Sequence, residues 1–397
     1  MEKSSSGIQG WPALDYEPRQ WTPRADGVSR RAVLAHSGPY RAAVTPRIAG
    51  ATVSLPSAVQ SLAEDASAEL ARVDATLRTS RIGPLPAVLL RTESASSSQI
   101  ERLTASAKSL AEAEIGERSG ANARLVLANV RAMERALAFD GPITLESILA
   151  VHAALIEPDP LHAPGLRDEQ VWVGGTTVGP HRADFVPPHH DRVPAAMADL
   201  VDFVGRTDIP VIAHLALAHA QFETIHPFTD GNGRTGRALL HMMLRESGLT
   251  RGSTIPVSAG LLHETDAYFA ALTAYREGDI EPVIERVAEA AIFASRLTLD
   301  LNARLQALAD EWLQRVRARK GASAWRLAEM LPAHPVVTYE VVQRVLGVSA
   351  PTAYVAIDAL ADAGVLVPRS TNKRNRVWDA VEVLAALDEF ADEARRG

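Results

Sequence analysis

The chain has 397 residues, of which 47% are hydrophobic and 22% are charged. This composition is typical of two or three soluble domains with a sizeable core. The formal net charge of -7 excludes a surface built throughout to coat nucleic acid, so a nucleic-acid role would need a local basic patch. The absence of cysteine excludes disulfides, thiolate metal sites and cysteine nucleophiles.

The N-terminal residues contain no apolar segment typical of a signal peptide, and no apolar run approaches the roughly 18 residues that span a bilayer. These features predict a cytoplasmic protein without a membrane partner. Residues 1–50 are rich in Pro, Gly, Ser and Arg and show no sustained period. This pattern predicts an arm laid over a folded domain.

Residues 51–139 predict a helical region, because apolar residues recur at helical spacing within 58–77, 98–115 and 122–139. Gly83-Pro-Leu-Pro86 and the serines at 96–98 are expected to interrupt these helices. A further helix is expected over 144–156, where Thr144, followed three residues later by Ser147, is a weak N-cap signal.

The pattern changes at residues 171–186, where β-branched residues surround a Gly-Gly pair and predict a small β-hairpin. Helical spacing returns near Val193 and continues through the rest of the chain. Helices are expected over 211–225, 235–246, 267–276, 281–299, 339–346 and 351–363. The expected order of parts is an N-terminal arm (1–50), a helical region (51–139), a core (140–300), a connecting helix (301–335) and a C-terminal domain (336–397).

Residues 226–237 read His-Pro-Phe-Thr-Asp-Gly-Asn-Gly-Arg-Thr-Gly-Arg and lie between two of the predicted helices. Gly231 and Gly233 allow consecutive backbone N–H groups to converge on an anion, and the next helix adds the positive end of its dipole. Arg234 and Arg237 are three residues apart, so in a first helical turn both can hold phosphate oxygens. The loop therefore predicts a polyphosphate site.

Two more residues of this loop carry chemistry. Asp230 is a hard oxygen ligand of the kind that Mg²⁺ takes together with substrate phosphates. His226 precedes a proline and so marks a helix end, where its imidazole can act as a base towards a hydroxyl. The loop has no lysine, which excludes a P-loop, and it lacks the helix face of a zinc protease. Three histidines of the flanking helices are expected to pack or to lie at the surface: His214, His219 and His241.

The loop resembles the signature of the Fic family, His-Pro-Phe-x-Asp/Glu-Gly-Asn-Gly-Arg-x-x-Arg, at every defined position. The resemblance covers about residues 40–300 and implies a mainly α fold, a Fic helical core with a β-hairpin flap. It implies that His226 is the general base and that Asp230 is the Mg²⁺ ligand. It also implies that Asn232, with the backbone of Gly231 and Gly233, holds the α-phosphate of ATP.

The same resemblance implies roles for four other residues. Arg234 would hold the departing β,γ-phosphates, and Arg237 would orient the γ-phosphate. Phe228 would anchor the loop in the core, and Tyr268 would contact the adenine. The hairpin at 171–186 would be the flap, which docks the backbone of a target protein by strand pairing.

Residues 97–101, Ser-Ser-Gln-Ile-Glu, resemble the inhibitory helix of one Fic class, whose pattern is Ser/Thr-x-x-x-Glu-Gly/Asn. The resemblance implies that Ser97 opens the motif and that Glu101 pairs with Arg237 in place of the γ-phosphate contact. Arg102 stands where the pattern has Gly or Asn. A long cation at that position could weaken or redirect the inhibitory contact.

The C-terminal part resembles a winged helix-turn-helix. Residues 348–354 would open the recognition helix, and 369–376 would form a basic wing in which Lys373, Arg374 and Arg376 contact DNA phosphates. The same module also serves protein contacts or dimerisation. DNA binding and a homodimer both stay open at this point.

These features predict an enzyme, a protein adenylyltransferase that transfers AMP from Mg-ATP to a Ser, Thr or Tyr hydroxyl of a target protein or of itself. Glu101 is expected to inhibit it. One alternative is a winged-helix DNA-binding regulator whose Fic portion senses nucleotide. Another is a Fic enzyme that removes AMP or transfers a different nucleotide.

Overall fold

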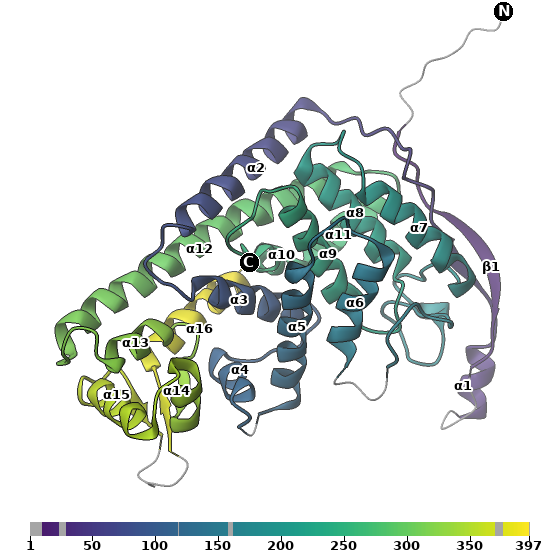
Figure 1. Ribbon diagram of the computed structural model, residues 1–397. Helices are drawn as coiled ribbons and strands as arrows, with labels where there is room; N and C mark the ends of the chain where they lie inside the picture. Colours follow the sequence, from purple (N-terminus) through teal and green to yellow (C-terminus); the bar gives the residue numbers. More distant parts are fainter. Residues whose placement is uncertain (1–9, 24–28, 118, 158–161, 370–375, 397) are drawn as a thin grey trace, which may run out of the picture. The chain divides into compact units, whose positions relative to one another are not determined.

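The computed structural model describes residues 10–23, 29–117, 119–157, 162–369 and 376–396. The described chain is mainly helical, which confirms the predicted fold class (Figure 1). Its contacts divide it into two compact units. The first comprises residues 1–65, 135–246 and 266–288, and the second comprises residues 66–134, 247–265 and 289–397.

A β-hairpin opens the first unit. β1 (Asp15–Trp21) and β2 (Gly38–Val44) pair antiparallel along their full length, with α1 (Arg30–Ala35) between them in the chain. The sequence predicts no strand here, because Pro18 and the scattered charges hide any alternation. Burial reveals the reason for the hairpin, since Tyr40 and other residues of β2 pack into the unit while β1 stays largely exposed.

The core of the first unit is a group of helices around α8 (Val211–Ile225). The others are α6 (Leu145–Ile156), α7 (Val193–Val204), α9 (Asn232–Glu246) and α11 (Thr265–Arg276), with the 3-10 turns η1 (Pro180–Arg182) and η2 (His190–Arg192). α8 is buried on all sides, as a central helix with apolar residues all round should be, and its bounds match the prediction. α7 and α9 both pack against it.

The start of α6 confirms the weak capping signal. Thr144 Oγ1 accepts from the backbone N–H of Ser147 at 3.2 Å, and Ser147 Oγ accepts from the backbone N–H of Thr144 at 3.0 Å. This capping box satisfies two backbone donors at the helix start. It places the buried face of α6 against the first unit's core, with His152 among its buried residues.

The predicted hairpin over 171–186 is present in a reduced form. Two isolated antiparallel bridges join Val173 to Phe185 and Thr176 to Gly179, without continuous strands. A Cβ atom on Gly175, whose φ is 73°, would lie 2.5 Å from the carbonyl oxygen of Arg182. Glycine is therefore required at this turn, and the glycines that predict the hairpin also shorten its strands.

The second unit is built from helices and one small sheet. Its helices are α3 (Leu85–Ile100), α4 (Ala107–Glu114), α10 (Val257–His263), α13 (Ser323–Met330), α14 (Tyr339–Leu346), α15 (Ala350–Asp362) and α16 (Val381–Arg395). Three longer helices contain residues of both units: α2 (Ser57–Leu77), α5 (Ala121–Ala138) and α12 (Glu281–Arg315). The sequence does not predict α10, α13 or α16, and α12 ends before the predicted limit of the connecting helix.

The serine run does not interrupt α3, so the predicted break at 96–98 and the predicted helix over 98–115 are wrong. The serines face the core instead: Asn129 Nδ2 of α5 donates to Ser94 O at 2.9 Å and to Ser98 Oγ at 3.2 Å. The break comes later, at Glu101 and Arg102, where the chain turns before α4. Small hydroxyl side chains here allow close packing of two helices.

The C-terminal part of the second unit contains an antiparallel sheet with the strand order β3 (Val336–Thr338), β5 (Val377–Asp379), β4 (Val367–Pro368). α14 and α15 precede β4, and Gly347, with φ 64°, forms the turn between them. Among the described residues no single helix has the length and apolar composition to cross a membrane, although α14 and α15, bent by 109°, pass that test as a pair.

Candidate active site

His226 ends α8 in a left-handed conformation with φ 51° and ψ 61°. Its Nδ1 lies 3.3 Å from the carbonyl oxygen of Glu223. A carbonyl can only accept, so Nδ1 carries the proton and Nε2 retains a lone pair. Burial lowers the pKa of His226 to about 4, and the imidazole is therefore neutral at pH 7. Nε2 is the atom that can take a proton from a hydroxyl.

Arg167 holds the end of α8 in place, a role that the sequence does not reveal. Its Nε donates to His226 O at 2.8 Å, and its Nη2 donates to the carbonyls of Ile225 and Pro188. Its backbone N–H donates to Pro227 O at 2.9 Å. The side chain is 4% exposed, and burial lowers its pKa to about 10. Arg167 is thus a charged donor fork that fixes the backbone beneath the imidazole.

His152 braces the other side of the loop. Its ring stacks on Phe228 with centroids 3.6 Å apart and planes 6° apart. Gly165 N–H donates to His152 Nδ1 at 3.4 Å, so Nε2 carries the proton and donates to Asp230 O at 3.1 Å. Burial lowers the pKa of His152 to about 4. The neutral ring therefore ties the loop to the segment that carries Arg167.

Asn232 closes the loop through its side chain. Oδ1 accepts from the backbone N–H of Phe228 at 2.8 Å, and Nδ2 donates to Phe228 O at 2.9 Å. The predicted contact of Asn232 with a phosphate then has to come from its backbone. Gly231 adopts φ 77°, and a Cβ there would lie 2.8 Å from Leu155 Cδ2, so glycine is needed for conformation and for space.

The predicted phosphate and metal residues lie at the start of α9. Arg234 Nη2 pairs with Asp230 Oδ2 at 2.9 Å, and their side chains are 3% and 41% exposed. Arg237 is also buried. Among the described residues no group of three or more His, Asp or Glu forms a metal cage. One half-exposed carboxylate fits Mg²⁺ that completes its shell with phosphates and water, because Mg²⁺ is commonly bound in that way.

Tyr268 lies in the core of the first unit. Its side chain is 1% exposed, and its hydroxyl is 2.8 Å from His219 Nε2. His214 is also buried, with Nε2 2.8 Å from Phe203 O, and His241 is buried on α9. These three histidines serve packing, one of the two roles expected for them. The adenine contact of Tyr268 stays a prediction.

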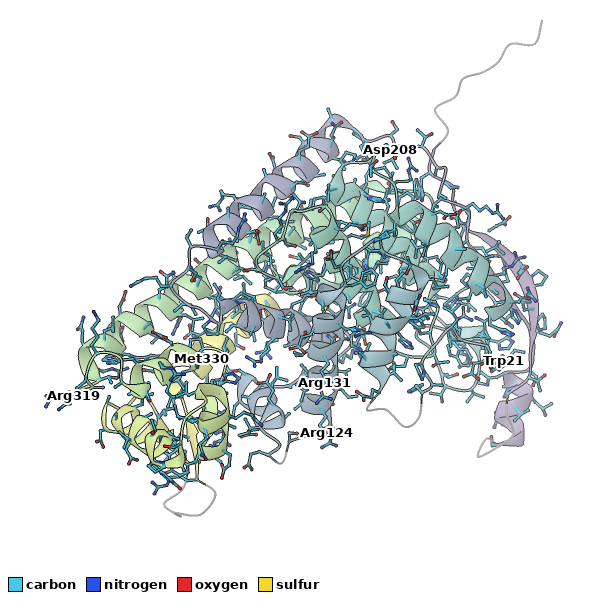
Figure 2. The ribbon with its side chains drawn as sticks, in the orientation of Figure 1. Trp21, Arg124, Arg131, Asp208, Arg319 and Met330 are labelled. Atoms are coloured by element: carbon cyan, nitrogen blue, oxygen red, sulfur yellow. The ribbon has the colours of Figure 1, made fainter. Side chains whose placement is uncertain are left out.

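The β1–β2 hairpin is tied to the predicted flap of the first unit. Figure 2 labels Trp21 on β1. Trp21 Nε1 donates to Val178 O at 3.0 Å, and its ring meets the Trp172 ring edge to face with centroids 5.1 Å apart. The backbone N–H of Ala43 donates to Val186 O at 3.0 Å. These bonds hold both the tip and the base of the flap.

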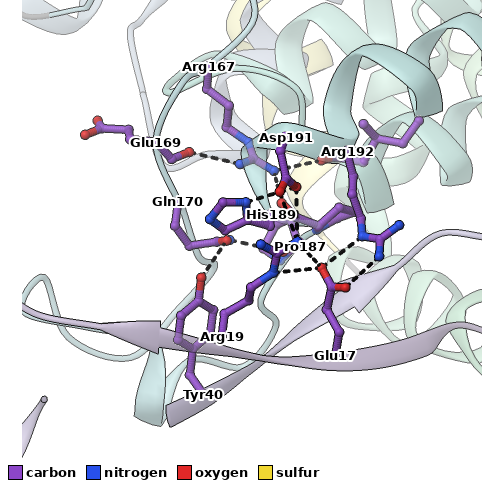
Figure 3. A network of polar contacts seen from close by, with 12 residues as sticks. Glu17, Arg19, Tyr40, Arg167, Glu169, Gln170, Pro187, His189, Asp191 and Arg192 are labelled. Atoms are coloured by element: carbon purple, nitrogen blue, oxygen red, sulfur yellow. Dashed lines mark hydrogen bonds and ion pairs between the residues drawn. The ribbon is translucent and has the colours of Figure 1, made fainter. Parts of the chain in front are cut away.

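A polar network surrounds the base of the flap, and Figure 3 shows it from close by. Glu17 on β1 bonds Arg192 and Arg19, and Arg19 also pairs with Asp191. The two guanidinium groups lower the pKa of Glu17 to about 2. Tyr40 on β2 donates to Gln170 at 3.0 Å, directly before the flap. The β1–β2 hairpin thus holds the flap in place, although the hairpin lies far from the flap in the sequence.

The predicted inhibitory residues belong to the second unit. Ser97 is 1% exposed within α3, and half-buried Glu101 is the last residue before the chain leaves the helix. Arg102 has φ 63°, a left-handed conformation that Gly and Asn adopt most readily. Of the predicted DNA contacts, Lys373 and Arg374 lie outside the described residues. Arg376 lies beside the Trp378 ring at 5.7 Å.

The part of the chain that contains this site is similar in sequence to known proteins. Residues 142–244 match the family model described as Fic/DOC family. A stretch of 152 residues is 34% identical to the protein adenylyltransferase fic-1 of Caenorhabditis elegans and covers 37% of this chain and 27% of that protein. A stretch of 151 residues is 34% identical to the protein adenylyltransferase Fic of Nematostella vectensis, covering 37% of this chain and 32% of that protein.

The matched stretch is therefore less than a third of either relative. The fold resembles the crystal structure of a Fic family protein from Desulfovibrio desulfuricans G20, with a TM-score of 0.52 and 20% identity. That likeness covers 85% of this chain and 98% of the other. The family match includes the whole loop from His226 to Arg237, and residues 142–244 of the chain are therefore similar in sequence to the Fic/DOC family.

Proposed function

We propose that this protein transfers AMP from ATP to the hydroxyl of a Ser, Thr or Tyr side chain, on a target protein or on itself. The observation that carries the proposal is the position of His226. Its Nε2 retains a lone pair at neutral pH. In the chain, His226 directly precedes a glycine-containing turn and a helix start suited to phosphates. The similarity to proteins named as adenylyltransferases supports the same chemistry.

In the proposed reaction the hydroxyl oxygen attacks the α-phosphorus of ATP. The hydroxyl proton passes to His226 Nε2, the new P–O bond forms, and the bond to the β,γ-phosphates breaks, so that pyrophosphate leaves. Arg167 keeps the imidazole in line by holding the carbonyls of Ile225 and His226. Positioning of this kind matters because a displacement of about 1 Å can cost 10²-fold in rate.

The start of α9 would hold the triphosphate. The backbone N–H groups at Gly231, Asn232 and Gly233 would face the α-phosphate, while Arg234 and Arg237 would hold the leaving phosphates. Asp230 would be the protein ligand of Mg²⁺, which, when bound, would neutralise charge on the phosphates. To do so, Asp230 would have to release part of its contact with Arg234.

The flap would present the target. An extended segment of another protein pairs well with a short β-bridge, because its backbone supplies donors and acceptors at a strand's spacing. The contacts of Trp21 and Ala43 hold the flap ready for such pairing. Regulation by Glu101 follows from the inhibitory pattern, in which its carboxylate would compete with the γ-phosphate for Arg237.

The test is incubation of the purified chain with Mg²⁺ and ATP labelled at either the α- or the γ-phosphate. We expect label from α-labelled ATP only, on the chain itself or on a protein in a lysate. His226→Ala should lower labelling by at least about 100-fold, because loss of a general base typically costs that much. Glu101→Gly should raise it, and His263→Ala serves as a matched histidine control. Absence of α-label on every protein with every variant would refute the transfer.

DNA binding is a second candidate with less support. α15, which would be the recognition helix, contains no lysine or arginine and carries Asp358 and Asp362. Such a helix would repel phosphates rather than attract them. The wing, at residues 369–376, offers four cations in eight residues.

A further inference from the structure

A pocket lies within the second unit between α3, α4 and the C-terminal helix α16. Figure 1 labels these three helices. Its volume is about 660 Å³ when the space at its open mouth is counted. The enclosed part of the pocket has a volume of about 60 Å³, which suits a small ligand better than a large one. None of its walls belongs to the loop from His226 to Arg237, so it is separate from the nucleotide site.

The walls of this pocket are mostly apolar. Val88 of α3, Leu110 of α4, and Leu387 and Phe390 of α16 supply aliphatic and aromatic surface. The prolines Pro332 and Pro335 also line it. A concave, largely apolar surface with a few polar groups is the usual form of a small-molecule site.

The charged groups in the wall already compensate each other. Arg91 and Glu114 form a hydrogen-bonded ion pair across α3 and α4, and Arg91 also donates to Ala333 O. A ligand with a net charge would have to disrupt this half-buried pair and leave one partner uncompensated, which is costly. The lining therefore favours an uncharged ligand, with a hydroxyl or similar group for the polar rim.

The pocket adjoins a set of contacts that connect the C-terminal part of the unit to α4 and, along the chain, to Glu101. α4 is held by the C-terminal part of the unit: Ala107 N–H donates to Asp388 at 3.3 Å, Lys108 pairs with Asp379 at 2.8 Å, and Arg369 pairs with Glu112 at 2.7 Å. Ala111 packs with apolar residues of β3, β5 and α16. Only residues 102–106 separate α4 from Glu101, so a shift of α4 relative to α3 would act on the Glu101 turn.

We propose that this pocket binds a small, uncharged, mostly apolar molecule and that its occupation is transmitted to the Glu101 turn. The binding itself is independent of catalysis, whereas its regulatory consequence rests on the proposed function. A ligand between α3 and α16 changes the packing of the helix that ends at Glu101. The C-terminal domain then acts as a sensor that sets how firmly the inhibitory segment is held.

The test uses the full chain without nucleotide, with benzyl alcohol as the uncharged probe and benzoate as its charged counterpart. Ligand-observed NMR should show saturable binding of benzyl alcohol and none of benzoate. Ala391→Leu, which fills the pocket from α16, should weaken binding by about tenfold or more, and Ala95→Leu, which fills it from α3, should do the same. Ala385→Leu, at an exposed position of α16, should leave binding unchanged.

Hydrogen exchange supplies the second readout. Benzyl alcohol should change amide exchange at residues 99–106 in the wild type and in Ala385→Leu but not in the two filled variants. Equal binding by wild type and both filled variants, absence of binding, or equal binding of benzoate would overturn the proposed site. Binding without any change at 99–106 would overturn the transmission. Both results are obtained without ATP, so they are distinct from a failure of AMP transfer.

Discussion

Two helices of this chain lead into turns that contain a non-glycine residue with positive φ, and the two turns are held in different ways. α8 ends at His226 with φ 51°, and the turn after α3 passes through Arg102 with φ 63°. Over the described ranges, these are the non-glycine residues with positive φ. Each costs roughly 1–2 kcal/mol, because the Cβ atom crowds the following carbonyl.

The supports of the two turns differ. At His226 the guanidinium of Arg167, from a distant part of the chain, bonds the carbonyls of the turn. At Arg102 the backbone hydrogen bonds are local: its N–H donates to Gln99 O at 2.8 Å, and Leu103 N–H donates to Ser98 O at 3.1 Å. At His226, where the imidazole must keep one position, a distant side chain thus holds the strained backbone. At Arg102, where the side chain is exposed, local bonds hold it.

The largest effect is expected from Arg167→Lys. Lysine keeps the charge but lacks the planar fork, so it cannot bond several carbonyls at once. We expect kcat for AMP transfer to fall about 100-fold, because the base loses its alignment. The KM for ATP should change little, since Arg167 bonds the turn at His226 and not the start of α9. Steady-state kinetics separate the two parameters.

Arg245→Lys is the matched control, because Arg245 is an exposed arginine at the end of α9. It should leave both parameters unchanged. Equal kcat values for Arg167→Lys and the wild type would remove the contrast between the two turns. A proportional loss of folded protein, measured by circular dichroism, would give Arg167 a role in stability alone.

An intermediate effect on stability and on the transfer rate is expected when the pH is lowered. Burial lowers the pKa of His226 and of His152 to about 4 from an unfolded value near 6.5. A depressed pKa means that the unfolded chain binds protons first, so the associated stability is full above pH 6.5, falls as the pH drops, and is lost near pH 4. The transfer rate should hold from pH 7 to about pH 5 and then decline as His226 is protonated.

A pH profile of single-turnover transfer, together with thermal unfolding at each pH, checks this expectation. An exposed histidine would lose half of its base form at about pH 6.5, so a midpoint there would contradict the half-buried, neutral imidazole. Hydrogen exchange sharpens the comparison of the two turns. Acid should loosen residues 226–232 before it loosens residues 98–103, which contain no histidine.

The sequence predicts the parts of this site that are contiguous. The loop from His226 to Arg237 and the limits of α8 follow from motif and periodicity, because each depends on residues close together in the chain. Arg167 and His152 escape prediction, since their contacts join positions 59 and 78 residues apart. A lone arginine before a hairpin and a lone histidine on an apolar helix have many ordinary explanations.

Periodicity also failed where packing overrides local preference. The serines of α3 favour a break in a water-exposed chain, but here they accept hydrogen bonds from Asn129 in a buried contact. The β1–β2 hairpin was missed because its partner is the rest of the unit, including Gln170 and Val186. In both regions the deciding contact lies far away in the sequence.

The smallest effect is expected from Arg102→Gly, which tests the turn that is held by local bonds. Glycine adopts the left-handed conformation without strain, but it also gains freedom in the unfolded chain, so the net gain should be about 0.5–1 kcal/mol. Arg102→Ala keeps the Cβ atom and should gain less, which separates backbone strain from loss of the arginine side chain. Thermal unfolding and exchange at residues 98–103 measure the difference. Equal stability of the two variants would mean that the relief of strain at Arg102 only offsets the entropy that glycine adds to the unfolded chain, and the expected net gain would then be wrong.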